Sequence, residues 1–419
     1  MKKFLCLCMA IVMTMLVAVP HGVADGDLSG TITIWSWDVA LEHLKTQAER
    51  FTKIHPNVSF NFEDMGVSQV YSKMTTCLQS GIGLPDVVTL EGEQMAKFGK
   101  KFPGKFYDFT SKINQKDFMP IKIGEATVDG KIIAFPWDSA PCGMFYRKDL
   151  FKNAGIDPKD IITWDDFIAK GKEMKEKTGV DMMIMALSRS DVMYRILMMQ
   201  LGGFYFDNEG NTQVNSDESI RAMQMVQDLY KAGIIFNDSG WDEKMTAISS
   251  GKVACVPEGV WMAGSIKEYC PDSSGNWGVM PLPRFDADKE VMTASNGGSV
   301  LAVPEASKSK DASVEFIIFA MTDIDANTDG FMKYGLYPSY IPSLDSDVFA
   351  NGDEFFGGDK IYETFRQLGE KSMAVNYTEN FAETMELCKS AISKVTTGGE
   401  DVKTVMENLQ TEMVSKFGK

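Results

Sequence analysis

The fold is decided near the N-terminus by residues 31–62, which read TITIWSWDVALEHLKTQAERFTKIHPNVSFNF. The β-branched residues that alternate over 31–35 predict a strand. Apolar residues then recur at intervals of three and four, which predicts one face of a helix: Leu41, Leu44, Ala48, Phe51 and Ile54. His55-Pro56 ends this helix, and the next apolar residues alternate as a second strand: Val58, Phe60 and Phe62. Such a strand–helix–strand unit predicts a parallel sheet.

The α/β pattern continues along the chain. Residues 85–90 predict a strand that ends at Glu91, and residues 253–256 predict another, which ends in a glycine turn before an aromatic residue opens a helix. Because 419 residues are too many for one ordinary core, we expect two lobes. The chain would pass between them near Pro136, Gly297 and Tyr337, forming a hinge that lets a cleft close.

The first 24 residues have the composition of a secretion signal. Lys2 and Lys3 precede an apolar stretch over 4–19, and the small residues of Gly22-Val23-Ala24 predict cleavage before Asp25. The apolar stretch is short for a membrane span of ~20 residues, and no cysteine lies at its end for lipidation. We therefore expect a free periplasmic or extracellular protein, without stable membrane insertion.

Charge and cysteine content exclude several classes of protein. Removing residues 1–24 takes away two lysines and no acid, so the formal charge changes from −16 to −18, which repels nucleic acid. Five cysteines remain, too dispersed for a zinc site or a disulfide framework: Cys77, Cys142, Cys255, Cys270 and Cys388. We expect most of them to be buried thiols, with a Cys255–Cys270 bridge as an alternative. We expect no metal and no cofactor.

Tryptophans stand beside carboxylates where predicted strands end or helices begin. The pairs are Trp37-Asp38, Trp137-Asp138 and Trp241-Asp242, and Trp261 follows Glu258 by three residues. An aromatic face stacks on the C–H face of a pyranose, and a carboxylate accepts hydrogen bonds from its hydroxyls. These residues therefore predict a sugar site, although core packing is the alternative for any one tryptophan.

Several stretches together resemble a known family. They are residues 51–58 (FTKIHPNV), 83–88 (GLPDVV), 145–151 (FYRKDLF), 201–203 (LGG), 251–261, 277–283 (WGVMPLP) and 297–304. In this order and spacing the chain resembles the bacterial extracellular solute-binding proteins of the sugar-transport type, the binding components of ABC importers, with maltose-binding protein as a distant relative. The resemblance runs from about Thr31 to the C-terminus.

The resemblance implies a two-lobed α/β fold, the type II periplasmic-binding-protein fold, in which each lobe is a sheet flanked by helices. Residues 25–138 plus 298–336 would form the N-terminal lobe, and residues 139–297 plus 337–419 the C-terminal lobe. It further implies a monomer that binds a carbohydrate, catalyses nothing and delivers the ligand to an inner-membrane ABC permease.

The resemblance also implies a set of ligand contacts. Trp261 matches an aromatic residue that stacks on sugar, while the other positions match segments that face the cleft: Trp37, Asp38, Glu91, Asp138, Gly297 and Gly298. Trp241 comes from the tryptophan pattern described above. The chain departs from the family near its C-terminus, where Tyr377 or Phe381 stands in place of a tryptophan, so the length of the ligand stays open.

Other functions share some of these features. A glycosidase would use paired acids near tryptophans, with Glu91 and Asp138, or Asp38 and Glu258, as the candidate pairs. A binding protein for a non-sugar solute and a signalling receptor would share the fold. Residues 325–330 match the start of a calcium loop, but Leu336 stands where the bidentate glutamate belongs, so a polar helix start is the alternative.

Overall fold

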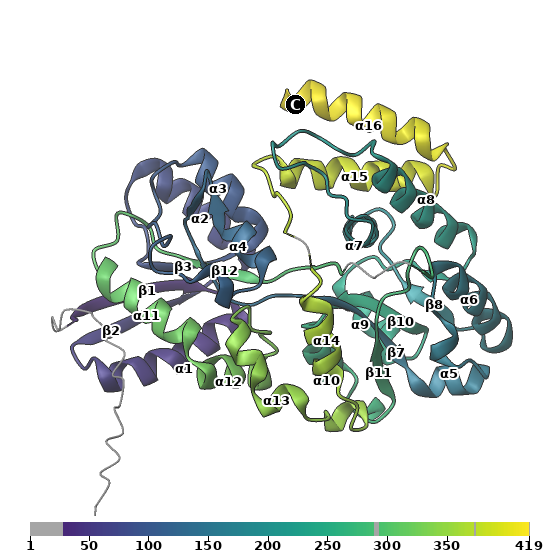
Figure 1. Cartoon of the computed structure of the whole chain (residues 1–419), viewed down its shortest axis with the longest axis horizontal. Helices are drawn as coiled ribbons and strands as arrows, with labels where there is room; N and C mark the ends of the chain where they lie inside the picture. Colours follow the sequence, from purple (N-terminus) through teal and green to yellow (C-terminus); the bar gives the residue numbers. More distant parts are fainter. Residues whose placement is uncertain (1–27, 289–292, 373, 419) are drawn as a thin grey trace, which may run out of the picture.

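The computed structural model describes residues 28–288, 293–372 and 374–418. Within these ranges the chain forms two lobes, each built around a five-stranded sheet with helices on its faces (Figure 1). The predicted signal segment, residues 1–24, lies outside the described residues. No helix in the described part of the chain combines the length and apolar character needed to cross a membrane.

The N-terminal lobe contains a mixed sheet in the order β2-β1-β3-β12-β6. Its strands are β1 (Gly30–Ser36), β2 (Val58–Asp64), β3 (Val87–Glu91), β6 (Phe135–Pro136) and β12 (Ser299–Ala302). The predicted strand–helix–strand unit is confirmed, because β1 pairs in parallel with both β2 and β3. The sheet is not wholly parallel, since β12 runs antiparallel to β3 and to β6.

Helices cover both faces of this sheet (Figure 1). They are α1 (Asp38–Ile54), α2 (Val67–Ser80), α3 (Met95–Lys101), α4 (Pro120–Ala126), α11 (Lys310–Thr322) and α12 (Ile324–Tyr334), with a small hairpin of β4 (Thr127–Val128) and β5 (Lys131–Ile132) beside α3. The predicted face of α1 is buried except at Ile54, which is 60% exposed in the last turn. Asp325–Gly330 lies within α12 rather than in a loop, so the residues do not have the arrangement of a calcium loop.

The C-terminal lobe contains a second mixed sheet in the order β11-β7-β10-β8-β9. Its strands are β7 (Cys142–Arg147), β8 (Asp181–Ile184), β9 (Ile235–Phe236), β10 (Val253–Gly259) and β11 (Trp277–Met280). The helices around it are α5 (Lys148–Ala154), α6 (Trp164–Thr178), α7 (Val192–Gln200), α8 (Asp217–Lys231), α9 (Trp241–Ser249), α10 (Met262–Tyr269), α13 (Asp347–Ala350), α14 (Ile361–Gly369), α15 (Phe381–Val395) and α16 (Val402–Phe417). Thr163 and Asp166 form a capping box at the start of α6.

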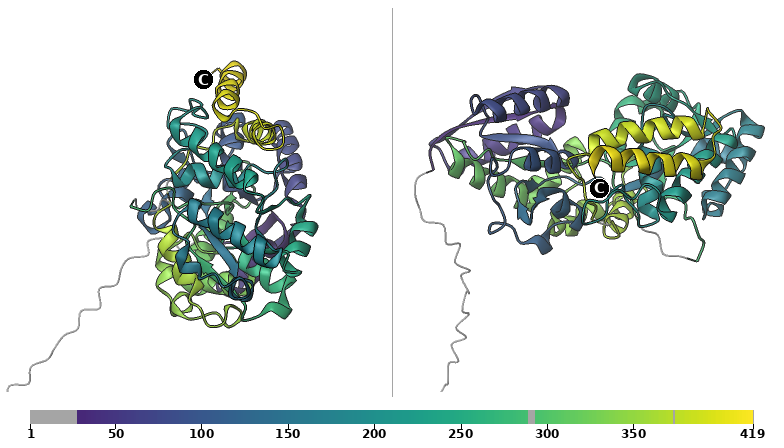
Figure 2. Two further views of the ribbon diagram at one scale, coloured as in Figure 1. Left: turned by 90° about the vertical axis from the view of Figure 1, so that its right-hand side faces the viewer. Right: turned by 90° about the horizontal axis from the view of Figure 1, so that it is seen from above.

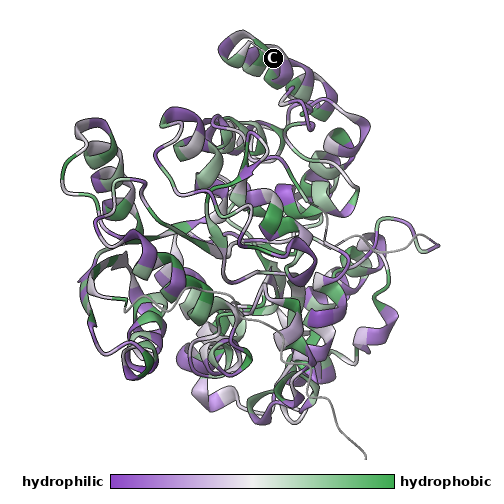
Figure 3. Cartoon of the chain, turned by 60° about the vertical axis from the view of Figure 1, so that its left-hand side comes forward, coloured by the Kyte–Doolittle hydropathy of each residue, from purple (hydrophilic) through white to green (hydrophobic). Residues whose placement is uncertain are grey.

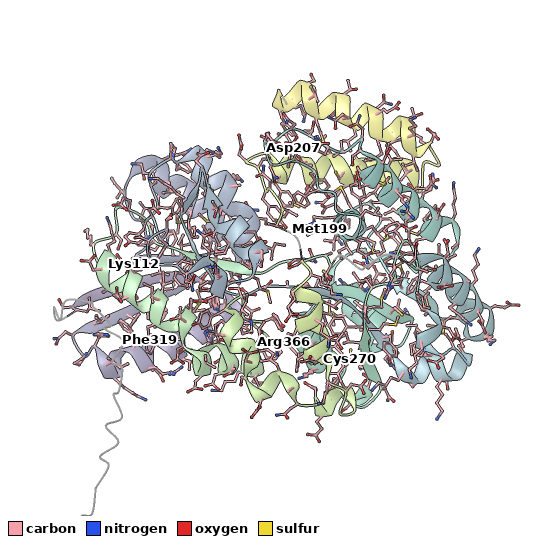
Figure 4. All side chains as sticks on the ribbon, viewed as in Figure 1. Lys112, Met199, Asp207, Cys270, Phe319 and Arg366 are labelled. Atoms are coloured by element: carbon pink, nitrogen blue, oxygen red, sulfur yellow. The ribbon has the colours of Figure 1, made fainter. Side chains whose placement is uncertain are left out.

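Each lobe has its own hydrophobic core. The right-hand view of Figure 2 shows the two lobes side by side along the long axis of the molecule. The surface helices carry both hydrophilic and hydrophobic residues along their length (Figure 3), as expected for helices that cover a core on one side. In Figure 4, Met199 of α7 lies in the C-terminal lobe and Phe319 of α11 in the N-terminal lobe. Met119, Ile121 and Phe331, which the predicted boundaries place in the N-terminal lobe, pack in the hydrophobic cluster of the C-terminal lobe. The predicted lobe boundaries stay a prediction.

Three chain crossings, paired by hydrogen bonds, join the lobes. Residues 137–141 form the central crossing, flanked by residues 294–298 on one side and 337–339 on the other. Backbone bonds run from Asn296 N to Ala140 O (3.0 Å) and from Ser139 N to Tyr337 O (2.7 Å). These are the crossings expected from the sequence, and they form the hinge.

All five cysteines of the described residues are buried free thiols. The alternative of a Cys255–Cys270 bridge is therefore wrong. Cys255 lies in the central strand β10, whereas Cys270 follows α10 (Figure 4), and burial raises the pKa of the Cys270 thiol to about 11. These side chains pack as small apolar groups.

Candidate functional site

Strand β10 ends two residues before Trp261, an aromatic residue near the hinge. Every residue of β10 is buried, and the strand is held between β7 and β8. At its end, a Cβ on Gly259 would lie 2.7 Å from Trp261 Nε1 and 2.9 Å from Asn296 O, so only glycine fits there. Trp261 Nε1 donates a hydrogen bond to Asn296 O at 2.9 Å. The indole ring is thereby fixed against the hinge.

A second tryptophan extends this aromatic surface. Trp241 is the first residue of α9 and is 41% exposed. Its ring centroid lies 6.2 Å from that of Trp261, with 35° between the ring planes. Two adjacent indoles, one of them open to solvent, form a surface on which the apolar face of a sugar ring can lie.

A cavity of about 260 Å³ lies directly beside Trp241 in the C-terminal lobe. Its polar wall combines groups of both charges: Arg189, Asp238, Lys244 and Glu258. The rest of the lining is formed by Ile184, Met185, Ala186, Ser190, Val192, Met193, Trp241 and Pro257. A concave apolar surface with a few convergent polar groups is the usual form of a small-molecule site.

Hydrogen bonds hold the buried carboxylates of this cavity in place. Glu258 is 4% exposed; it accepts from Lys244 Nζ at 2.8 Å and from Asn296 Nδ2 at 2.5 Å. Burial raises the pKa of Asp238, an effect that the charge of Lys244 opposes. Carboxylates that alternate with cations offer both acceptors and donors, which is what a ligand hydroxyl requires because it accepts and donates.

Arg195 on α7 connects this cavity wall to the N-terminal lobe. The guanidinium is buried, and it donates to Asn296 Oδ1 at 3.1 Å and to Glu93 Oε2 at 3.2 Å. Glu93 follows β3, so this ion pair joins the two lobes. Burial raises the pKa of Glu93 to about 7, although Arg195 opposes the shift.

The predicted contacts of the N-terminal lobe lie at the ends of β1 and β3. Glu91 accepts a hydrogen bond from the Tyr71 hydroxyl at 2.5 Å. The Trp37 ring meets Tyr71 edge to face, with 6.4 Å between the centroids. Asp38 is exposed and has a φ of 46°, an uncommon backbone conformation for aspartate. Trp37, Asp38 and Glu91 therefore lie near one another but do not line the cavity beside Trp241.

Three more of the predicted contacts belong to the hinge. The buried carboxylate of Asp138 accepts from Ser299 N at 2.7 Å, and burial raises its pKa. Gly297 and Gly298 have φ values of 104° and 95°, and a Cβ on Gly298 would lie 2.6 Å from Asp138 O. These residues allow the crossings to approach closely. Trp137, which the tryptophan pattern marked as a sugar contact, is buried against His43 in the N-terminal core.

Tyr377, in the segment before α15, does not line the cavity beside Trp241. It is 6% exposed and packs edge to face on Phe381, with 4.7 Å between the ring centroids. It also lines a crevice of about 410 Å³ between residues 124–130 of the N-terminal lobe and the 376–380 segment. Asn376 Nδ2 donates to Asp207 O at 2.8 Å, which ties this segment to the loop that carries Asp207 (Figure 4).

The structure adds polar residues that the sequence did not indicate: Arg189, Asp238, Lys244, Asn296, Arg195 and Glu93. Asp238 follows β9 by two residues, so its position after a strand was an available signal. Asp242, the acid adjacent to Trp241, is exposed instead. Among the residues that the structure describes, no group of three or more His, Cys, Asp or Glu is placed to hold a metal ion.

The chain is a type II two-lobed binding protein, as defined by its two five-stranded sheets, the three crossings and the candidate site beside the hinge. The family model of the bacterial extracellular solute-binding proteins matches residues 40–326, and the chain belongs to this family.

Its relatives support the same assignment. A lactose-binding protein of Rhizobium radiobacter is 34% identical over 361 residues, covering 83% of this chain and 84% of the relative. An arabinooligosaccharide-binding protein of Bacillus subtilis (strain 168) is 24% identical and covers 94% of each chain. Among solved structures, the sugar-binding protein MalE from Xanthomonas citri has a TM-score of 0.80 at 19% identity, covering 92% of this chain and 98% of that one.

Proposed function

We propose that the protein is the extracytoplasmic binding component of an ABC importer, which captures a carbohydrate by closing its lobes and delivers it to a membrane permease. The protein would act as a monomer in the periplasm or outside the cell. The observation that carries this proposal is the pair Trp241 and Trp261 beside a cavity lined by Asp238, Lys244 and Glu258. The indoles suit the C–H face of a sugar, and the charged groups suit its hydroxyls.

The positions of the cavity and of the contact between the lobes support closure. The cavity belongs to the C-terminal lobe, whereas Glu93 reaches Arg195 from the N-terminal lobe across the hinge. A ligand that contacts both lobes stabilises the closed state more than the open one and so shifts the population. The relatives include proteins named for binding lactose, arabinooligosaccharide and maltodextrin, which supports a carbohydrate as the ligand here.

The hydrolytic alternative has less support from the carboxylates themselves. Of its candidate acids, Asp138 is buried and bonded to Ser299 N, and Glu258 is held by Lys244 and Asn296. Glu91 is bonded to a phenol, and Asp38 is exposed on the N-terminal lobe. Neither proposed pair has its two carboxylates on the wall of the same described cavity.

Differential scanning fluorimetry against sugars, with spermidine as a non-sugar control, tests the proposal. We expect a carbohydrate to raise the melting temperature, because a ligand that binds only the folded state stabilises it. The bound sugar should be recovered intact by mass spectrometry after a day. Stabilisation by spermidine alone, or cleavage that is lost in Asp138→Asn, would replace this proposal with a non-sugar binder or a glycosidase.

A further inference from the structure

The α9–α10 face next to the cavity carries an unusual concentration of exposed aromatic surface. The chain has 45 aromatic residues in total, as 7 Trp, 12 Tyr and 26 Phe. Of those that the structure describes, Trp241 and Tyr269 are the most exposed, at 41% and 45%. These two rings touch each other, with 6.3 Å between centroids and 85° between planes. Adjacent exposed aromatic rings indicate a surface that binds something.

The rings form an extended row that begins at the fixed indole. Trp261 is the N-cap of α10 and Tyr269 is its last residue, so the helix separates them by about 12 Å at 1.5 Å per residue. Trp241 bridges this interval, with its centroid 6.2 Å from Trp261 and 6.3 Å from Tyr269. Helices α9 and α10 lie against each other beside the hinge (Figure 1). The row therefore leads from the hinge, past the cavity wall, to the solvent.

The outer end of the aromatic row, at Tyr269, offers a hydrogen-bonding group beside a ring, as the inner end near Trp241 does. The Tyr269 hydroxyl makes no hydrogen bond to any residue in the described ranges, so it can bond to a ligand hydroxyl. Lys244 Nζ lies 6.0 Å from the Trp241 ring centroid and also bonds to Glu258 at 2.8 Å. Aromatic faces flanked by hydrogen-bonding groups thus continue beyond the cavity. A ligand that follows them must present an apolar face and hydroxyls at each step.

We propose that Trp241 and Tyr269 form an outer subsite and that the ligand is an oligosaccharide of three or more rings rather than a monosaccharide. This inference rests on the proposed function, because it assigns the length of the carbohydrate that the same site holds. The cavity beside Trp241 encloses one end of the chain. The rings that follow leave the cavity over Trp241, and the outermost one lies against Tyr269.

Calorimetric titration with ladders of malto-, galacto- and arabino-oligosaccharides of one to five rings tests this proposal. In the best ladder, affinity should rise up to at least three rings. Tyr269→Ala should weaken binding of members with three or more rings by about three- to ten-fold, in keeping with the known contribution of aromatic contacts, and leave the shortest binding member unchanged. Tyr269→Phe should keep most of the affinity because the ring is retained.

The matched control is Val414→Ala, an apolar residue on α16 that is 41% exposed, close to the 45% of Tyr269. It should leave every affinity unchanged. The outer subsite is overturned if affinity stops rising after one ring, or if Tyr269→Ala binds every length as the wild type does. In either case the shorter sugar still binds and the proposed function stands. Failure of all ladders to bind the wild type would instead overturn the proposed function.

Discussion

Each lobe has a glutamate at or near the end of its central strand, but the two carboxylates have different partners. Glu91 at the end of β3 is bonded to the neutral hydroxyl of Tyr71 within its own lobe and lines no described cavity. Glu258 near the end of β10 is buried, paired with Lys244 and Asn296, and forms part of a cavity wall. Under the proposed function, the C-terminal lobe would hold a site formed in advance, and the N-terminal lobe would provide the wall that closes on it. Preorganisation of this kind lowers the cost of binding.

The largest expected effect comes from removing the fixed indole of the C-terminal lobe. A micromolar ligand binds with about −8 kcal/mol, and a buried aromatic contact accounts for roughly 2 kcal/mol of it. Trp261→Ala should therefore weaken carbohydrate binding by about 30-fold in calorimetry, with the fold intact by circular dichroism. Trp37→Ala, the matched change in the N-terminal lobe, should weaken it by about three-fold or less. Equal losses in the two variants would remove the distinction between the lobes.

A smaller effect is expected from the buried acid of the cavity. Asp238→Asn removes the charge that strengthens hydrogen bonds to ligand hydroxyls, which is worth about 1.5 kcal/mol, or roughly ten-fold in affinity. Glu91→Gln should change affinity by less than three-fold, because its partner Tyr71 can still bond to the amide. Calorimetric titrations of both variants with the same saccharide in the same buffer check this comparison. A greater loss in Glu91→Gln than in Asp238→Asn would assign the main polar contact to the N-terminal lobe.

The smallest effect concerns Glu93, whose carboxyl group contacts Arg195 between the lobes. Burial raises the pKa of Glu93 from 4.5 to about 7, so the folded protein holds this proton where the unfolded chain has lost it. Stability from this group must therefore fall as the pH rises from about 4.5 to 7. Melting temperatures measured from pH 5 to pH 8 should decline less steeply in Glu93→Gln than in the wild type. An exposed acid on α16 provides the control, as Glu407→Gln should keep the wild-type slope.

Local patterns predicted much of the fold. The apolar spacing of residues 31–62 gave the parallel β1-α1-β2 unit, because side-chain periodicity follows the backbone repeat. Ile54 was assigned to the buried face but is 60% exposed at the C-terminal end of α1, although Phe51 in the same turn packs on Phe316 and Phe319 of α11. The reversal of β12 relative to β3 could not be predicted, as strand direction depends on crossings that are distant in sequence.

The candidate site could be predicted only in part, because its residues also come from segments that are distant in sequence. Trp261 was proposed as a site residue because a buried strand, a glycine and an aromatic residue are adjacent in sequence, and it lies beside Trp241 and the hinge. Arg189 and Asp238 were missed because the cavity forms where the segments after β8 and β9 converge, and no sequence spacing reports that convergence. Asp138 and Gly298 were noticed as site residues, yet their observed contacts are with the crossings of the hinge. Chain reversals and ligand contacts both favour such residues, so sequence alone does not separate them.

The most direct test of the central claim is a crystal structure of the protein with the saccharide that stabilises it most. The account predicts a sugar ring in the cavity beside Trp241, within hydrogen-bonding distance of Asp238 or Glu258, with the chain leading past the α9–α10 face. It also predicts that the N-terminal lobe meets the ligand from the opposite side. A saccharide bound only between residues 124–130 and 376–380, or held by Trp37 and Glu91 with the cavity unused, would contradict the account.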